Sequence, residues 1–316
     1  MISMKRVLVT CPPMLGLFDE FVAPAKALGI EIIAAKTTQV LSEEELMQLL
    51  PAFDGWIIGD DPATRQVFEA AVNGHLTAAV KWGIGVDNVD FDACKELNIP
   101  ITNTPNMFGG EVADVAMSLL LGLTRQTHFI DREIRNNFAW PKPAGISIEG
   151  KTIGVVGFGD IGSSLVKRLS GFGVKVIAYD PGVEGDNGYD FVERAAFPER
   201  LGDVDALIFT CSLNKHNRHM LNDNTLSMMK NGALVVNVAR GPLIDEQALI
   251  SSLQSGRIAA AGLDVFEVEP LPQSSALRDM PQCIFGSHNS SNSVDGVRRA
   301  TFKALEEISS FFERQK

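Results

Sequence analysis

The chain has 316 residues, of which 45% are hydrophobic and 21% charged, and its formal net charge is −11 at pH 7. This length allows two domains of ordinary size, and no apolar run approaches the roughly 18 residues that span a bilayer. The acidic balance disfavours a nucleic-acid partner, because it would repel a phosphate backbone. We therefore expect a water-soluble protein that binds neither nucleic acid nor membranes.

The N-terminal sequence and the cysteines indicate the location of the protein and the state of its thiols. The N-terminal stretch MISMKRVLVTCPP has two basic residues but only a strand-length apolar run and no cleavage site. It predicts no signal peptide and a cytoplasmic location. The cysteines are widely separated and form no CxxC pair, which disfavours a zinc site and a disulfide framework. We expect reduced, mostly buried thiols at Cys11, Cys94, Cys211 and Cys283.

The first third of the chain alternates short apolar runs with amphipathic stretches. Such alternation is typical of parallel strands joined by helical crossovers. Pro24 predicts that the first helix begins late or is kinked. We expect strands at 6–10, 30–35, 55–60 and 77–85, with helices at 15–28, 42–50 and 64–72.

The middle of the chain begins with a long amphipathic stretch, in which apolar residues between 112 and 123 recur at the spacing of one helix face. We predict a single helix over about 110–136. The segment NNFAWPKPAGISIEGK is rich in Pro and Gly and is predicted to be a loop. A second series then predicts another doubly wound domain, with strands at 151–159, 174–180, 205–211, 233–239, 258–266 and 283–288, and a last helix at 294–312.

A glycine motif, GxGxxG, stands directly after the first strand of the second series and at the start of a helix. Alone it is weak evidence, because glycine is common and a turn beside an unrelated acid would look the same. Its glycines, Gly157, Gly159 and Gly162, permit a tight turn, close approach of a pyrophosphate, and close helix packing. The next strand ends in Asp180, about 20 residues after the middle glycine, as expected for a ribose contact. The pattern predicts a dinucleotide site, and the charge of Asp180 favours NAD over NADP because it would repel a 2′-phosphate.

Polar side chains follow three predicted strands of the second series, where open parallel sheets bind ligands. They are Arg240 in NVARGP, Asp264 and Glu269 in GLDVFEVEP, and His288 in FGSHNSSN. Each alone has an ordinary explanation, because an acid near a turn is usually solvated and an arginine can extend to solvent.

Together these groups supply what the reduction of a 2-oxo acid requires. A hydride that reaches the ketone carbon leaves charge on oxygen, which needs a proton donor, and the substrate carboxylate needs a cation. His288 can give the proton, and Glu269, if hydrogen-bonded to it, would stabilise the imidazolium and raise its pKa. Arg240 would bind the carboxylate with its planar fork.

The chain resembles the D-isomer-specific 2-hydroxyacid dehydrogenase family, and within it the phosphoglycerate-dehydrogenase-like members. The resemblance covers nearly the whole length. Several motifs in the same order are far more specific than any one of them. They are KWGIGVDNVD at 81–90, ITNTPN at 101–106, the glycine motif, NVARGPLIDEQAL, AGLDVFEVEP and the His288 segment.

The resemblance implies an NAD-dependent oxidoreductase that transfers a hydride between nicotinamide and C2 of a D-2-hydroxy acid or 2-oxo acid, phosphoglycerate-like or otherwise polar. It places Arg240, Glu269 and His288 in the catalytic positions. It also implies that the backbone amides of Trp82, Gly83 and Ile84 bind the substrate carboxylate, together with Arg240 and His288. The implied cofactor contacts are Gly157, Phe158, Gly159, Asp160, Ile161, Gly162, Asp180, Cys211, Ser212, Asn237, Val238, Ala239, Arg240, Asp264, which would hold the carboxamide, and His288.

The resemblance further implies a particular domain organisation. An α/β Rossmann NAD-binding domain, residues 105–289, is inserted into a flavodoxin-like substrate-binding domain formed by residues 1–104 and 290–316. The active site is then expected between the domains, with a hinge closure that excludes water. The long first helix of the NAD-binding domain is expected to help form a homodimer.

Two segments depart from the family pattern. After the strand at 205–211 the chain continues as CSLNKHNRHM, where a Pro-Leu-Thr type of turn is common in the family. His216 and His219 lie there three residues apart, but without a third ligand we expect no metal site. After His288, the residues Asn289, Ser290 and Ser291 replace small apolar residues or glycine. Their polar groups indicate either a polar substrate or the cap of the last helix, for which Asn292 or Ser293 is also suited.

Two other functions are compatible with this fold. Formate dehydrogenases resemble the chain but pair the histidine with glutamine, so Glu269 disfavours that function. An NAD(H)-sensing, corepressor-like binding protein would retain the catalytic residues while acting through partners. Turnover of NADH with a 2-oxo acid distinguishes the enzyme from such a binding protein.

Overall fold

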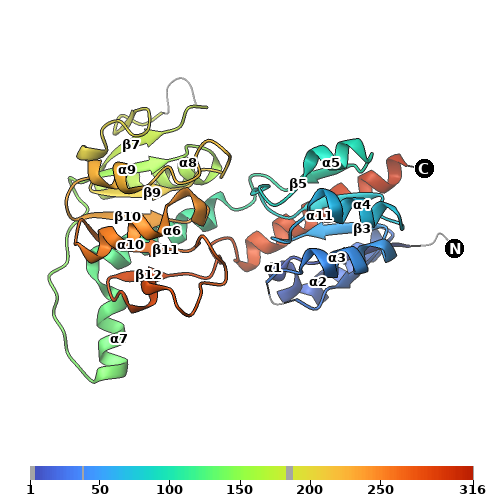
Figure 1. The fold of residues 1–316 in the computed structure, drawn as a ribbon, viewed down its shortest axis with the longest axis horizontal. Helices are drawn as coiled ribbons and strands as arrows, with labels where there is room; N and C mark the ends of the chain where they lie inside the picture. Colours follow the sequence, from blue (N-terminus) through green and yellow to red (C-terminus); the bar gives the residue numbers. More distant parts are fainter. Residues whose placement is uncertain (1–3, 38, 183–187, 316) are drawn as a thin grey trace. The chain divides into compact units, whose positions relative to one another are not determined.

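A computed structural model describes residues 4–37, 39–182 and 188–315 of the chain, which forms two compact units (Figure 1). The first unit contains Met1–Met107 and Asn292–Lys316, and the second contains Phe108–Ser291. The first unit is therefore built from both ends of the chain. Among the described residues, no helix combines the length and the apolar character needed to cross a bilayer.

The first unit contains a five-stranded parallel sheet in the order β2-β1-β3-β4-β5. This is the flavodoxin-like order. Successive strands are added in one direction from β1 to β2, and in the other direction from β3 to β5, so the switch point lies between β1 and β3. The predicted strand at 77–85 ends early, because its glycine-containing second half forms a loop. The strands are β1 (Lys5–Val9), β2 (Ile30–Ala34), β3 (Gly55–Ile58), β4 (Ala78–Lys81) and β5 (Ile101–Asn103), the last of which was not predicted.

The helices of the first unit follow local signals in the sequence. The stretch predicted as one helix at 15–28 is divided at Leu17, and Pro24 lies inside the second piece. Ser42 forms a capping box with Glu45, in which each side chain accepts a hydrogen bond from the backbone N–H of the other residue. The helices are α1 (Pro12–Gly16), α2 (Phe18–Ala27), α3 (Glu43–Leu49), α4 (Arg65–Val72), α5 (Phe91–Glu96) and α11 (Val294–Arg314).

The C-terminal helix α11 packs on the sheet of the first unit. Gly55 of β3 lies beneath it, and an added Cβ there would be 2.8 Å from the side chains of Ile308 and Phe312. Ser293 caps this helix, since its hydroxyl accepts a 2.9 Å hydrogen bond from the N–H of Gly296. The prediction that residue 292 or 293 caps the last helix is therefore confirmed, at Ser293.

The second unit contains a seven-stranded parallel sheet in the order β12-β11-β10-β9-β6-β7-β8. The first strand of the unit lies inside the sheet and the order reverses there, as in a Rossmann fold. All six predicted strands are present. They are β6 (Thr152–Val156), β7 (Lys175–Tyr179), β9 (Ala206–Phe209), β10 (Ala233–Asn237), β11 (Ile258–Leu263) and β12 (Cys283–Phe285), and the unpredicted edge strand is β8 (Val192–Arg194).

The single helix predicted over 110–136 is wrong. The helix is interrupted at Gln126. The left-handed φ of this residue, 53°, ends the first helix, and a second helix begins after it. The side chain of Gln126 donates a 3.0 Å hydrogen bond to the carbonyl of Ala144, which ties the break to the following loop. The helices of this unit are α6 (Gly109–Arg125), α7 (Thr127–Asn137), α8 (Asp160–Leu169), α9 (Asp223–Met228) and α10 (Glu246–Gln254).

Candidate active site

The GxGxxG turn joins β6 to the N-terminus of α8. Gly157 has a φ of 95°, and an added Cβ would lie 2.6 Å from the backbone of Cys211. At Gly162 an added Cβ would lie 2.0 Å from the carbonyl oxygen of Gly157. Backbone contacts therefore require both glycines. Around Gly159, by contrast, an added Cβ would meet no atom within 4 Å, so the backbone at the helix N-terminus is open on this side, and such N-termini favour anions.

Asp180 follows β7 and is fixed beside this turn. Its Oδ2 atom accepts a 2.6 Å hydrogen bond from the N–H of Phe158, and its Oδ1 atom accepts one of 2.8 Å from the N–H of Gly182. A carboxylate oxygen has two lone pairs, so each retains capacity to accept a ribose hydroxyl. The residues present therefore fit a dinucleotide.

Arg240 lies in a turn after β10 that is held by hydrogen bonds with the side chain of Asn237. Asn237, which is buried, donates from Nδ2 to the carbonyl of Arg240 at 2.9 Å and accepts from the N–H of Ala239 at 3.0 Å. The next residue, Gly241, contacts the following strand end, because an added Cβ would lie 1.9 Å from the carbonyl of Phe266. The turn that carries Arg240 is thus packed directly against the turn after β11.

His288 and Glu269 meet at this edge of the sheet. Nδ1 of His288 is 2.7 Å from Oε2 of Glu269, and Oε1 of Glu269 accepts a 2.9 Å hydrogen bond from the N–H of Phe266. The two side chains are 22% and 24% exposed, so the pair is shielded but can be reached from solvent. With Nδ1 bonded to the carboxylate, Nε2 is the ring nitrogen that can exchange a proton with a ligand.

Asp264 orients the backbone that carries His288. The Asp264 carbonyl accepts a 2.7 Å hydrogen bond from the N–H of His288, whose φ of 55° is left-handed. The buried Asp264 carboxylate accepts from the N–H groups of Asn289 at 3.1 Å and Ser290 at 2.9 Å, and also from the Ser290 hydroxyl. These bonds compensate the burial of its charge. The Ser290 hydroxyl therefore bonds Asp264, a role that neither sequence interpretation of this segment included.

A second histidine–glutamate contact, which the sequence reasoning missed, lies among the same turns. Nε2 of His219 is hydrogen-bonded to Oε1 of Glu267, and the N–H of His219 donates to the carbonyl of Pro242 at 2.8 Å. The pair therefore joins the segment after β9 to the turns after β10 and β11. A sequence search misses it because its members are 48 residues apart. Within the described ranges, no group of three potential metal ligands is present.

The segment that departs from the family pattern forms an ordered turn. Nδ2 of Asn217 donates to the carbonyl of Ser212 at 2.7 Å, and its Oδ1 accepts from the N–H of Asn214 at 2.7 Å. Ser212 is exposed, whereas the backbone of Cys211 lies against Gly157. This places Cys211 next to the glycine turn.

In the first unit, the loop after β4 provides fewer backbone donors than expected. The N–H of Trp82 donates to the carbonyl of Ile58 at 2.9 Å, and the N–H of Gly83 donates to Oγ1 of Thr104 at 2.7 Å. Within the described part of the chain, the N–H of Ile84 has no acceptor. Of the three amides implied by the resemblance, that of Ile84 is left to bind a ligand.

The side chain of Trp82 points into the interior of the first unit. It is buried, and Nε1 donates a 3.1 Å hydrogen bond to Oγ1 of Thr301 in α11. Its role is therefore to pack the loop against this helix.

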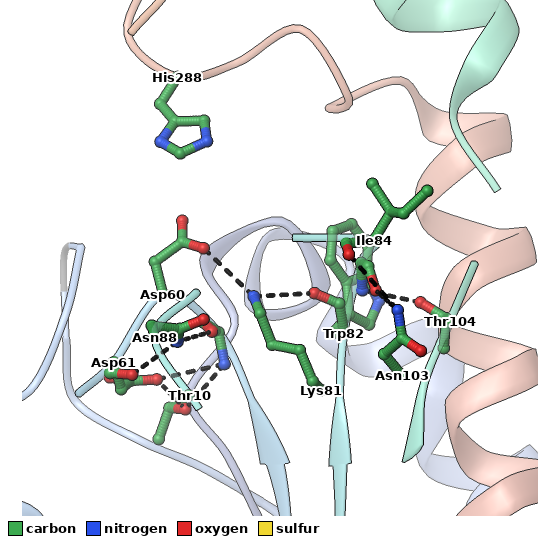
Figure 2. A network of polar contacts seen from close by, with 12 residues as sticks. Thr10, Asp60, Asp61, Lys81, Trp82, Ile84, Asn88, Asn103, Thr104 and His288 are labelled. Carbon is green, nitrogen blue, oxygen red and sulfur yellow. Dashed lines mark hydrogen bonds and ion pairs between the residues drawn. The ribbon is translucent and has the colours of Figure 1, made fainter. Parts of the chain in front are cut away.

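A polar network lies along the carboxyl edge of the same sheet (Figure 2). Lys81, the last residue of β4, donates from Nζ to Oδ1 of Asp60 at 3.2 Å and to the carbonyl of Trp82 at 3.1 Å. The neighbouring Asp61 is buried and accepts hydrogen bonds from the Thr10 hydroxyl and from backbone N–H groups. Burial raises the pKa of Asp61 above its usual value, although these hydrogen bonds oppose the shift.

Sequence comparison and structure comparison relate this chain to the same group of proteins. Residues 117–290 match the model of the D-isomer specific 2-hydroxyacid dehydrogenase NAD binding domain. A hydroxypyruvate reductase of Thermotoga maritima is 34% identical over 86% of this chain and 89% of its own length. A glyoxylate reductase of Thermococcus onnurineus is 36% identical over 73% of this chain and 71% of its own length. The apo-structure of Escherichia coli D-lactate dehydrogenase is 26% identical with a TM-score of 0.83, covering 98% of this chain and 97% of that one.

The fold and these matches define an NAD-dependent oxidoreductase that interconverts 2-oxo acids and 2-hydroxy acids. The chain belongs to the D-isomer specific 2-hydroxyacid dehydrogenase family. The predicted family, the α/β fold with two parallel sheets, the enzyme class and the cofactor are all confirmed.

Proposed function

We propose that Arg240, Glu269 and His288 are the catalytic residues of this enzyme. The observation that carries the proposal is the 2.7 Å contact between Nδ1 of His288 and Oε2 of Glu269, on the strand edge where Arg240 also lies. NADH, when bound, supplies a hydride to the carbonyl carbon. Nε2 of His288 gives a proton to the carbonyl oxygen, and the Glu269 carboxylate stabilises the imidazolium beforehand. Arg240 binds the substrate carboxylate.

The second unit is proposed to hold NAD through the groups that line the glycine turn and the adjoining strand ends. The open space at Gly159 and the fixed carboxylate of Asp180 support this placement. Asp180 accepts the ribose hydroxyls, and Asp264 holds the nicotinamide carboxamide. The remaining proposed contacts are Gly157, Phe158, Asp160, Ile161, Gly162, Cys211, Ser212, Val238 and Ala239.

The first unit is proposed to bind the substrate. The N–H groups of Ile84 and Gly85 have no acceptor within the part of the chain that the structure describes, and they follow the buried end of β4. Two adjacent backbone donors at the carboxyl end of a parallel strand suit a carboxylate. The similarity to a hydroxypyruvate reductase and a glyoxylate reductase favours a small 2-oxo acid.

Two variants test the catalytic assignment. We expect Arg240→Ala to lower kcat/KM for 2-oxo acids by roughly 10²–10³, because a charge-assisted bidentate contact is lost, while NADH binding is retained. Arg240→Lys keeps the charge without the planar fork and should recover only part of the loss. His288→Ala should abolish the chemical step. NADH binding is followed by fluorescence and turnover by absorbance; normal turnover of either alanine variant contradicts its assignment.

We also propose that the enzyme is a cytoplasmic homodimer. Helix α7 (Figure 1) has no buried residue. It is followed by Phe138 and Trp140, which are 94% and 78% exposed. Large apolar side chains grouped on a surface mark contact sites, and a second copy of the chain would cover them. Sedimentation of the wild type should give a dimer, and replacement of both aromatic residues by serine should shift it to a monomer. Dependence on NADH favours the cytoplasm, which cell fractionation tests.

A further inference from the structure

His219 contacts both turns that carry proposed catalytic residues of the second unit's sheet edge, one through its backbone and one through its side chain. Its N–H donates a 2.8 Å hydrogen bond to the carbonyl of Pro242, two residues after Arg240. Its Nε2 atom is hydrogen-bonded to Oε1 of Glu267, two residues before Glu269. A substitution that changes only the side chain therefore releases the turn that carries Glu269 and leaves the turn that carries Arg240 bonded.

The turn that carries Glu269 extends from the core towards solvent. Within it Val268 is 60% exposed, so hydrophobic burial does not fix this part of the chain. Glu267 is held there at two points, because its N–H donates to Oε2 of Glu246 at the start of α10 and its carboxylate accepts from His219. The bond to Glu246 is 3.4 Å long and therefore weak. The imidazole of His219 is thus the stronger of the two contacts.

The other charged groups that face Glu267 do not replace this contact. Arg218 lies 3.9 Å from Oε1 of Glu267, and its side chain is 59% exposed, so solvent screens this ion pair. Burial raises the pKa of Glu246, and the charge of Glu267 adds to the shift while the hydrogen bond from the Glu267 N–H opposes it. Glu246 therefore offers no attraction to the carboxylate. His219 is its one hydrogen-bonded side-chain partner among the described residues.

We propose that His219 positions Glu269 for its contact with His288. It does so through Glu267, whose place in the turn sets where the carboxylate of Glu269 lies. Hydrogen bonds of this kind span about 2.7–3.2 Å, and the contact between Nδ1 of His288 and Oε2 of Glu269, at 2.7 Å, is lost by a small movement of the turn. Glu269 then stabilises the imidazolium of His288 less well. This inference rests on the proposed catalytic roles of Glu269 and His288.

The test compares His219→Asn with His219→Gln in the reduction of hydroxypyruvate or glyoxylate. The φ of His219 is 52°, a left-handed value that asparagine adopts more readily than glutamine. The asparagine amide is too short to reach Glu267, whereas the glutamine amide extends as far as Nε2 of the imidazole. Because small misplacements slow the chemical step, we expect His219→Asn to lower kcat roughly tenfold and to move the high-pH limit to lower pH. His219→Gln should restore most of both. Backbone strain alone would give the opposite order.

The kinetic constants separate positioning from a general loss of structure. Because the backbone bond to Pro242 is kept, the KM for the 2-oxo acid, which reports on Arg240, and the dissociation constant of NADH should change less than about twofold. Arg218→Ala is the matched control, since this exposed side chain faces the same oxygen of Glu267, and it should leave kcat and the pH profile unchanged. Glu267→Ala should reproduce His219→Asn. The double variant should be no worse than either, because both remove one contact.

Parallel measurements on Glu269→Gln distinguish the possible failures. If Glu269→Gln shifts the pH profile but His219→Asn retains the kcat and profile of the wild type, the inference is overturned and the proposed function stands. Additive losses in the double variant, or a glutamine variant no better than asparagine, also overturn the inference. A wild-type profile for Glu269→Gln overturns the proposed function itself. Thermal melting checks folding, and Glu267→Ala decides the matter if His219→Asn is unstable.

Discussion

Nδ1 of His288 lies 2.7 Å from Oε2 of Glu269, although the two residues belong to turns that follow different strands, β12 and β11. The second oxygen of Glu269 is held by the N–H of Phe266, so the carboxylate cannot rotate away without losing a hydrogen bond. This arrangement fixes the ring of His288 and assigns proton exchange to Nε2.

Glu269→Gln should change the pH dependence of both directions of the reaction. Glutamine keeps an acceptor for Nδ1 but removes the negative charge, so the imidazolium becomes less favourable. Reduction needs the imidazolium, and its high-pH limit should therefore move to lower pH. Oxidation needs the neutral ring, and its low-pH limit should move in the same direction. Profiles of kcat/KM against pH that coincide with those of the wild type would refute this role of Glu269.

Gly159→Ala and Gly162→Ala should separate cofactor binding from stability. At Gly159 the new Cβ meets no protein atom within 4 Å, so the melting temperature should be preserved while NADH binding weakens about tenfold or more. At Gly162 the new Cβ would lie 2.0 Å from a backbone carbonyl oxygen. Such overpacking costs about 1–3 kcal/mol, so the melting temperature should fall. Thermal melts and NADH titrations measure the two effects, and equal destabilisation by both substitutions would contradict the distinction.

Asp180→Asn should relax the preference between the two nicotinamide cofactors. The wild type should use NADH at least ~100-fold better than NADPH, because a like charge beside the 2′-phosphate costs several kcal/mol. Asparagine can still accept the hydrogen bond from the N–H of Phe158, so the glycine turn should keep its shape. Ratios of kcat/KM for the two cofactors measure the change. A wild type that uses NADPH as well as NADH would remove Asp180 from this role.

The cysteine thiols should be unreactive in the native enzyme. Burial raises the pKa of Cys11, Cys94 and Cys211 to about 12, and that of Cys283 to about 11. Because the thiolate is the reactive form, almost none is present at pH 8. A chromogenic disulfide reagent should therefore react slowly until a denaturant is added, after which all 4 thiols titrate. Rapid modification of the native enzyme at pH 8 would show that a thiol is accessible.

Features that depend on local pattern could be predicted from the amino-acid sequence alone. Alternation of apolar and amphipathic stretches predicted both parallel sheets, because strands and crossover helices leave their periodicity in the chain. The glycine motif and Asp180 predicted the cofactor for the same reason, since their spacing reflects one continuous βαβ unit. Arg240, Glu269 and His288 were singled out because each follows a strand whose end is visible in the sequence.

Features that depend on contacts between distant segments could be recognised only in the folded chain. The break at Gln126 is held by a bond to Ala144, which helical periodicity does not reveal. Likewise, the hydrogen bonds of Ser290 with Asp264 and of Lys81 with Asp60 join residues about 20 or more positions apart. Whether a buried polar group is satisfied, and by which partner, is set by how the strands are brought together, because hydrogen bonding depends on distances that a one-dimensional pattern does not contain.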